Sequence, residues 1–170
     1  FSPNGEYIAT ASRDRTIKIW NANGTLIRTL KGHKDAVLGL TFSPDGKYLA
    51  TSSRDRSIKI WNLEGQLISS IQAHEKQIND LAYSPDGKIL ATVSANRHLK
   101  FWQILAQGKI SSQPPQVINT PDNLRTVAFS PRGKMVAVGG DDKAIRLFQL
   151  DRQNIVTRET HKQNSLGILT

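Results

Sequence analysis

A five-residue phrase occurs four times in this chain: an aromatic residue, then Ser-Pro, one variable residue and Gly. The copies span residues 1–5, 42–46, 83–87 and 129–133, so successive copies lie 41, 41 and 46 residues apart. An aromatic residue further along each unit keeps the same spacing, at Trp20, Trp61, Trp102 and Phe148. A period near 40 residues with constant internal order predicts one supersecondary unit stacked on copies of itself. Such arrays usually offer binding surfaces rather than a single enclosed reaction site.

Each unit predicts four short antiparallel strands. In the second unit, a strand around 37–42 leads into the Ser-Pro-Asp-Gly turn, and the gap between its apolar residues predicts a β-bulge after Val37. Alternating strands over 48–53 and 57–61 are joined by the acidic turn Arg54-Asp55-Arg56, and a fourth strand covers 67–71. Such a sheet is apolar on both faces, so neighbouring sheets must cover it. We therefore expect an all-β β-propeller of four-stranded antiparallel blades.

The repeat also predicts the unit boundaries. The blade units cover approximately 1–30, 31–71, 72–118 and 119–159, and residues 160–170 begin a further blade. We expect one propeller fragment over 1–170, an open arc of about four blades from a larger ring; a closed four-blade ring is the alternative. The interval from Trp102 to Thr120 is 18 residues, against 13 elsewhere, which predicts a longer surface loop around 111–115.

Composition narrows the classes of partner and compartment. The net charge of +9 favours an anionic partner. The chain has no Cys, which excludes disulfides and thiolate metal sites and fits a reducing compartment. No apolar run is long enough to cross a bilayer and no signal peptide opens the chain. We expect a cytoplasmic protein without membrane partners.

Each complete unit also repeats a His, a hydroxyl, an acid or amide and an indole at fixed offsets. A hydroxyl, a His and a carboxylate could form a catalytic triad. The set recurs with the period, however, and its donors and acceptors can satisfy one another inside a blade. We therefore interpret it as structural. The residues are His33, Thr51, Asp55 and Trp61 in the second unit, His74, Thr92, Asn96 and Trp102 in the third, and Thr10, Asp14 and Trp20 in the first.

The chain resembles the WD-repeat β-propeller family over nearly its whole length. The resemblance rests on the Gly32-His33 pair, the Phe-Ser-Pro-Asp-Gly turn, the acidic turn and the Ile-Trp-Asn strand ending. It extends to the long WD-repeat arrays of bacterial multidomain signalling proteins. The resemblance implies that the His, hydroxyl, acid and Trp form a structural hydrogen-bond tetrad, with no catalytic residue, cofactor or metal.

The fourth unit departs from the family pattern. It has Thr120, Val138 and Phe148 where His, Thr and Trp would stand, and it keeps only Asp142. A tetrad cannot form there, so we expect this blade to rely on apolar packing and to be the least protected of the four. An alternative interpretation of the basic residues is that the turn arginines are solvated and that Arg146 points outward along its strand, like Lys18, Lys59 and Lys100 at the same position of the other units.

The resemblance further implies where partners dock, on the edge formed by the acidic turns and the loops that enter each first strand. The candidates are Arg13, Arg15, Arg54 and Arg56 around the acidic turns, and Leu38, Gln77, Asn79, Asn123 and Arg125 around the first strands. Basic residues next to the acid recur in all four turns. We name this set the basic rim; it comprises Arg13, Arg15, Arg54, Arg56, Arg97 and Lys143.

These observations favour a non-catalytic protein-interaction scaffold, a WD-repeat module of a larger regulatory or signalling protein. A scaffold for nucleic-acid or for phosphorylated or acidic partners, bound through the basic rim, is the alternative. Nucleic acid is the weaker expectation, because the aromatic residues are committed to the core and few remain to stack on bases. An enzyme would need acids or imidazoles converging on a central channel, and Asp35, Asp80 and Asp122 do not share one offset.

Overall fold

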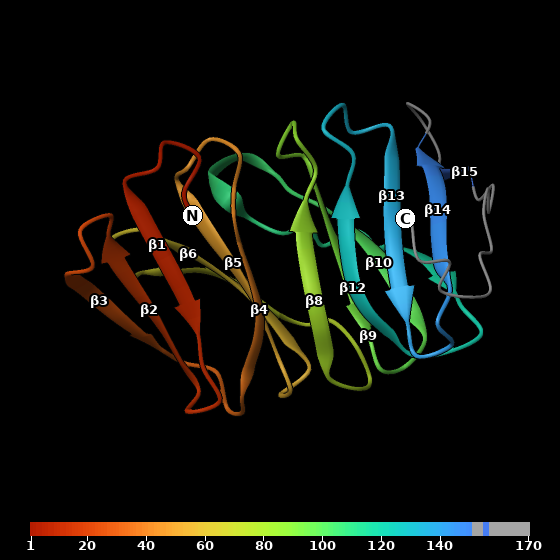
Figure 1. Ribbon diagram of the computed structural model, residues 1–170, viewed down its shortest axis with the longest axis horizontal. Coiled ribbons are helices and arrows are strands. Elements are labelled where there is room, and N and C mark those ends of the chain that lie inside the picture. Colours follow the sequence, from red (N-terminus) through yellow and green to blue (C-terminus); the bar gives the residue numbers. More distant parts are fainter. Residues whose placement is uncertain (151–154, 157–170) are drawn as a thin grey trace, which may run out of the picture.

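The computed structural model describes residues 1–150 and the strand Ile155–Val156, and it consists of four antiparallel sheets standing side by side (Figure 1). Within each sheet, strands adjacent in sequence are adjacent in space. The all-β fold and the open, unclosed arrangement of its blades confirm the expectation. The expected start of another blade at 160–170 lies outside the described residues.

Each sheet is formed by strands that are consecutive in the chain. The first sheet contains β1 (Tyr7–Ala11), β2 (Thr16–Asn21) and β3 (Leu26–Lys31); the second β4 (Val37–Phe42), β5 (Tyr48–Ser53), β6 (Ser57–Asn62) and β7 (Leu67–Gln72); the third β8 (Ile78–Tyr83), β9 (Ile89–Ser94), β10 (His98–Gln103) and β11 (Gln116–Asn119); the fourth β12 (Leu124–Phe129), β13 (Met135–Gly140), β14 (Ile145–Leu150) and β15 (Ile155–Val156).

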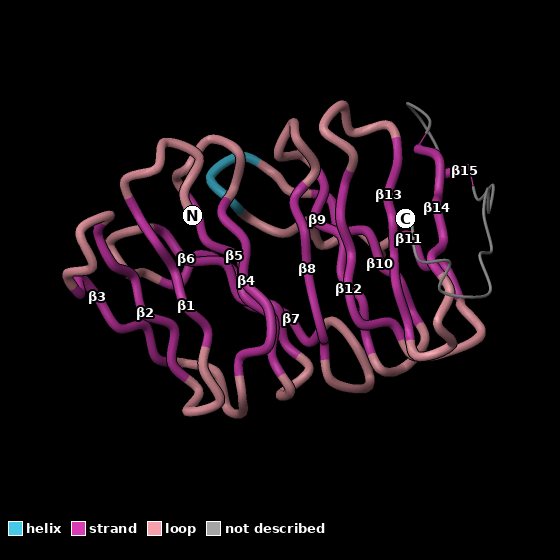
Figure 2. Tube along the Cα trace, viewed as in Figure 1, coloured by secondary structure: helices cyan, strands magenta, loops and turns pink. Residues whose placement is uncertain are grey.

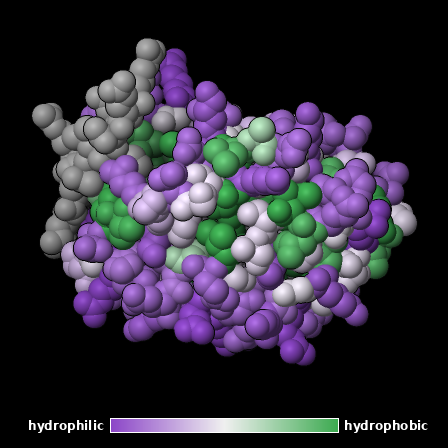
Figure 3. Space-filling view, turned by 180° about the vertical axis from the view of Figure 1, so that it is seen from behind, coloured by the Kyte–Doolittle hydropathy of each residue, from purple (hydrophilic) through white to green (hydrophobic). Residues whose placement is uncertain are grey.

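The core lies between neighbouring sheets, as radial stacking requires. One cluster joins the first and second sheets through Ile17, Ile19, Leu49 and Trp61, and two similar clusters join the second to the third and the third to the fourth. Alternation at period two places these residues on the faces of each sheet. Seen from behind, hydrophobic residues form a broken band across the molecule between hydrophilic edges (Figure 3).

The inner strands β4, β8 and β12 lie next to one another and carry the predicted bulge. The pairing with the following strand shifts by one residue between Val37 and Gly39, and in the same way in β8 and β12. The extra residue is Leu38 in β4, Asn79 in β8 and Arg125 in β12. A bulge bends a strand and redirects a side chain, so one residue per inner strand is turned toward the edge where the strand begins.

The long loop between β10 and β11 has secondary structure of its own and packs against the core. It contains the short 3-10 turn η1 (Ala106–Gly108) and a bridge between Ile104 and Ile110 (Figure 2). Both isoleucines pack against the core between the second and third sheets, so the loop folds back over the second blade. The described part of the chain contains no helix long and apolar enough to cross a membrane.

Candidate partner-binding rim

The four tetrad residues of the second blade meet beneath the acidic turn. Trp61 Nε1 donates to Thr51 Oγ1 at 3.0 Å, Thr51 Oγ1 lies 2.8 Å from His33 Nε2, and His33 Nδ1 lies 2.9 Å from Asp55 Oδ2. A carboxylate only accepts and an indole N–H only donates, so the proton of His33 belongs on Nδ1. The Thr51 hydroxyl then donates to His33 Nε2, which completes a continuous series of hydrogen bonds from Trp61 in β6 through Thr51 in β5 to His33 in the loop before β4 and Asp55 in the β5–β6 turn.

Asp55 ties this chain to the turn that carries the basic rim. Its carboxylate accepts hydrogen bonds from the Ser57 hydroxyl at 2.6 Å, from the Ser57 backbone N–H at 2.9 Å and from the Lys34 backbone N–H at 2.7 Å. Burial raises the pKa of this carboxyl, but the hydrogen bonds from Ser57, Lys34 and His33 outweigh burial and lower the pKa to about 2. The carboxylate therefore stays ionised and holds the loop before β4 against the β5–β6 turn.

The third blade has the same series of hydrogen bonds, with an amide in place of the acid. His74 Nε2 lies 2.8 Å from Thr92 Oγ1, and Trp102 Nε1 donates to Thr92 Oγ1 at 2.9 Å. His74 Nδ1 faces Asn96 Oδ1 at 3.2 Å, a longer contact than that of His33 with Asp55. Burial, with the charge of Lys100, lowers the pKa of His74 to about 3. Burial lowers the pKa of His33 too, but there the Asp55 carboxylate opposes the shift.

This difference predicts a pH dependence of stability. Between about pH 3 and 6.5 the unfolded chain protonates His74 while the folded chain does not, so stability should fall as the pH falls, by about 1.4 kcal/mol per pH unit for one proton. The change Asn96→Asp restores a carboxylate and should raise the His74 pKa. Urea unfolding between pH 4.5 and 6.5, with an NMR titration of His74, should show a shallower slope for the variant. An unchanged slope would contradict this account.

The first blade keeps a reduced version of the network. Trp20 Nε1 donates to Thr10 Oγ1 at 3.1 Å. Asp14 accepts from the Thr16 hydroxyl at 2.7 Å and from its backbone N–H at 2.9 Å, and these bonds lower the pKa of Asp14. In each of the first three blades the acid or amide lies in the acidic turn, the Thr lies within the strand before that turn, and the Trp lies near the far end of the strand after it, from where its indole N–H reaches the Thr hydroxyl.

In the fourth blade a buried ion pair replaces the tetrad. Arg146 is 2% exposed, and its guanidinium pairs with the Asp142 carboxylate, with one contact of 3.2 Å from Nη1 to Oδ1. The expectation of purely apolar packing is therefore wrong, as is an outward-pointing Arg146. Val138 and Thr120 stand where Thr and His stand in the second and third blades, so the hydrogen-bond partners of the tetrad are missing here.

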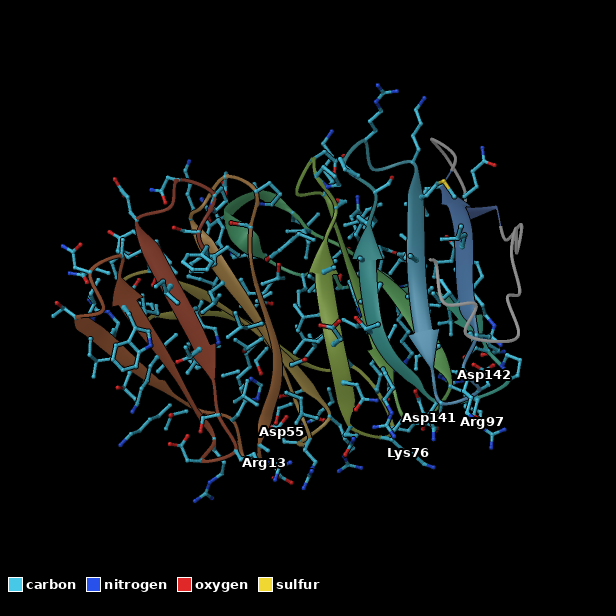
Figure 4. All side chains as sticks on the ribbon, in the orientation of Figure 1. Arg13, Asp55, Lys76, Arg97, Asp141 and Asp142 are labelled. Atoms are coloured by element: carbon cyan, nitrogen blue, oxygen red, sulfur yellow. The ribbon has the colours of Figure 1, made fainter. Side chains whose placement is uncertain are left out.

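The basic rim has an unusual backbone. Arg15, Arg56, Arg97 and Lys143 all have positive φ angles, of 73°, 71°, 66° and 60°. Each follows the acidic or amide position and closes a tight turn; Arg56 N, for example, donates to Ser53 O at 3.2 Å. This left-handed conformation is uncommon for residues other than Gly. Arg13, Arg54 and these four side chains are exposed, and Figure 4 shows Arg13 and Arg97 along the edge that also holds Asp55 and Asp141.

The candidates on the inner strands fall into two groups. Asn79 Nδ2 donates to Leu124 O at 2.6 Å, which links the third blade to the fourth, and Gln77 Nε2 donates to Asn79 Oδ1 at 2.8 Å. These two amides are therefore engaged in holding blades together. Leu38, half-buried, carries no such link.

Arg125 and Asn123 are both directed to Asp141. Arg125 makes a bidentate pair, with Nε to Oδ1 at 2.5 Å and Nη2 to Oδ2 at 2.9 Å, and Asn123 Nδ2 donates to Oδ2 at 3.3 Å. Asp141 and Asp142 thus offset the positive charge at the fourth blade. The excess positive charge along this edge therefore lies on the first three blades.

Sequence reasoning missed two cations on the same edge. Lys34 and Lys76, both exposed, lie in the loops that enter β4 and β8, and Figure 4 shows Lys76 along the same edge as Asp141 and Arg97. The sequence could have indicated both lysines, since each closely follows a tetrad His. In the described residues, no group of three or more His, Cys, Asp or Glu is placed to hold a metal ion.

Comparison with known proteins assigns the family. Residues 1–168 match the sequence family described as the IFT122 first beta-propeller. The nuclear distribution protein nudF of Aspergillus terreus is 56% identical over 41 residues, and the nuclear distribution protein PAC1 of Coccidioides posadasii is 54% identical over 41 residues. Each match covers 24% of this chain and 9% of the relative, so the chain spans only a small part of these relatives. The likeness to bacterial arrays stays a prediction. The chain belongs to the family of the IFT122 first β-propeller, within the WD-repeat β-propellers.

Proposed function

We propose that this chain is a non-catalytic interaction scaffold of a larger regulatory or signalling protein in the cytoplasm, and that its basic rim binds an acidic segment of a partner protein. The observation that carries the proposal is the backbone of the rim, where four basic residues stand in left-handed conformations. Membership of a WD-repeat propeller family supports the scaffold role.

The strain at these positions argues for a role of the side chains. Gly adopts positive φ at no steric cost, whereas other residues lose about 1 kcal/mol there. Arg15, Arg56 and Arg97 have exposed side chains, and none forms a salt bridge within the described residues, so folding gains little from their charge. A basic side chain in all four turns is therefore better explained by attraction to an anionic partner.

Charge reversal on the rim tests the proposal. The triple change of Arg13, Arg54 and Arg56 to Glu should weaken binding of a fluorescein-labelled Glu-rich dodecapeptide by about tenfold or more at low salt. The matched control changes Lys88, Arg132 and Lys134 to Glu, which alters net charge equally on exposed turns at the opposite edge. Fluorescence anisotropy should show near-original affinity for the control. Equal losses of peptide affinity in the two triple variants, or an affinity that does not change with salt, would refute peptide binding at the basic rim.

A second variant separates binding from folding. The change Arg56→Gly relieves the positive φ but adds Gly flexibility to the unfolded chain, so the free energy of unfolding should change by less than about 1 kcal/mol. Peptide affinity should still fall. If Arg56 served only the fold, the free energy of unfolding would change and the peptide affinity would not.

Nucleic acid remains the second candidate because of the net charge of +9. Against it, Trp61, Trp102, Phe101 and Phe148 are buried, at 3%, 8%, 5% and 4% exposure, and offer no stacking surface. Retention on immobilised single-stranded DNA or RNA at physiological salt, stronger than retention on the acidic peptide, would favour this alternative.

A further inference from the structure

The loop that interrupts the repeat builds a hollow on the second blade. A depression of about 630 Å³ is bounded by the β4–β5 and β6–β7 turns on one side and by Gln107 and Lys109 of the loop on the other. This volume lies within the usual range of ligand pockets. In Figure 2 the cyan η1 turn lies at the edge away from the acidic turns, so the hollow is remote from the basic rim.

The loop that forms one wall is held in place. Leu105 N donates to Lys109 O at 2.8 Å, Ile104 N to Lys88 O at 2.8 Å, and Ile110 N to Ser69 Oγ at 3.3 Å, a bond to β7 of the second blade. Gly108 is buried with φ +74°, and a Cβ there would stand 2.9 Å from the Tyr48 ring. The backbone can approach Tyr48 this closely only because residue 108 is Gly.

The floor and the margin of the hollow differ chemically. Its apolar lining comes from Tyr48, Leu63, Leu67 and Ile68, and Leu67 is 47% exposed. An exposed leucine beside half-buried apolar neighbours can bury an aliphatic side chain of a ligand. The floor therefore favours a ligand with such a side chain.

Two unpaired cations stand at the margin. Lys47 and Lys109 are exposed, and in residues 1–150 neither ammonium group has a salt-bridge partner. Glu64 supplies one opposing charge, so the margin carries a net charge of +1 from these three groups. Charge complementarity then favours a carboxylate next to the aliphatic group.

Gln107 adds a group suited to a peptide backbone. It has a positive φ of 61° in the hollow's wall, and its exposed side-chain amide forms no hydrogen bond with the described residues. An amide offers one acceptor and two donors, which match the C=O and N–H of an extended peptide. This strained backbone lies in the longer loop between β10 and β11, whose extra residues distinguish the third unit in the sequence.

We propose that this hollow is a second binding site, which takes an extended peptide with one large aliphatic side chain followed by an acidic residue. The aliphatic side chain packs over Leu67 and Tyr48. The carboxylate lies between Lys47 and Lys109, and Gln107 pairs with the peptide backbone. The site stands on its own geometry and does not depend on the function proposed for the basic rim.

NMR of the uniformly ¹⁵N-labelled chain provides the test, with the blocked peptide acetyl-Gly-Leu-Asp-Gly-amide as probe. Binding should be weak, in about the millimolar range expected for so short a peptide. The amide signals of Gly46, Lys47 and residues 107–109 should move. Peptides with Asn for Asp, or Gly for Leu, should bind at least about threefold more weakly.

Variants place the site. Lys47→Glu and Lys109→Glu should each weaken binding by about threefold or more, while Glu64→Gln should strengthen it. Lys88→Glu is the matched control, because Lys88 occupies the same turn position in the third blade outside the hollow. Urea unfolding should be unchanged in all four variants.

Three results would overturn the proposal: no movement of those amide signals, equal affinity for the Asp and Asn peptides, or equal losses in Lys47→Glu and Lys88→Glu. Arg54→Glu, on the basic rim, should leave this peptide's affinity unchanged. Failure of the rim and failure of the hollow are therefore distinguishable.

Discussion

Replacing Thr51 by Val should lower the free energy of unfolding by about 2–4 kcal/mol, although the two side chains have nearly the same shape. Thr51 is 0% exposed, and its hydroxyl joins Trp61 Nε1 at 3.0 Å to His33 Nε2 at 2.8 Å. Valine removes the shared partner and leaves two buried polar groups unsatisfied. Each such group costs about 1–3 kcal/mol, whereas the added methyl group returns only part of this.

The first blade supplies the matched control. Thr10 holds the same position and accepts from Trp20 Nε1 at 3.1 Å, but it is exposed, so water can replace its hydroxyl. Thr10→Val should cost less than about 1 kcal/mol. Urea unfolding followed by tryptophan fluorescence and circular dichroism measures both variants. Equal losses in the two blades would show that the buried chain of hydrogen bonds is not what stabilises the second blade.

Features that repeat were predictable from the sequence. The period fixes the sheets, and the gap after Val37 predicts the bulge, which recurs in β8 and β12. The fixed spacing of His33, Thr51, Asp55 and Trp61, together with their complementary donors and acceptors, predicted a hydrogen-bond network in the second blade. These inferences succeed because each depends on local turn geometry or on an offset that several units share.

Features that belong to one unit were not predictable in the same way. The loop after β10 was expected at the surface, but nothing in Ser111 to Pro115 indicates that Gly108 packs on Tyr48 of another blade. Asn79 was expected to be a partner-binding residue, yet its amide donates to Leu124 O of the neighbouring blade. Such contacts join segments far apart in sequence, and their partners depend on how neighbouring blades stack.

Arg146 shows the limit of arguing from the repeat. Its position corresponds to Lys18, Lys59 and Lys100, which are half-buried; Lys59 Nζ donates to Ser70 Oγ at 2.7 Å and Lys100 Nζ to Ala73 O at 2.9 Å. From the alternation along the strand alone, an outward side chain was one interpretation for Arg146. Where His and Thr are missing, the longer guanidinium turns inward instead and meets the acid that the fourth blade retains.

This substitution of an ion pair for a tetrad predicts the second large effect. Asp142→Asn should lower the free energy of unfolding by about 3 kcal/mol, because the guanidinium of Arg146, 2% exposed, keeps its charge and loses the carboxylate that balances it. Asp14→Asn in the first blade is the matched control and should lose less, since Asp14 is exposed and bonds only to neighbouring Thr16 and Ser12 groups. Urea unfolding measures both.

The size of the loss depends on which partner is removed, and this distinguishes the ion pair from ordinary packing. Arg146→Met removes the buried charge and keeps most of the apolar stem, so it should cost less than Asp142→Asn. Once Met is present, the further change Asp142→Asn should cost little, which gives a coupling energy of at least about 1.5 kcal/mol in the double-mutant cycle. Additive losses would mean that the two side chains stabilise the fourth blade independently, and that apolar packing alone accounts for it.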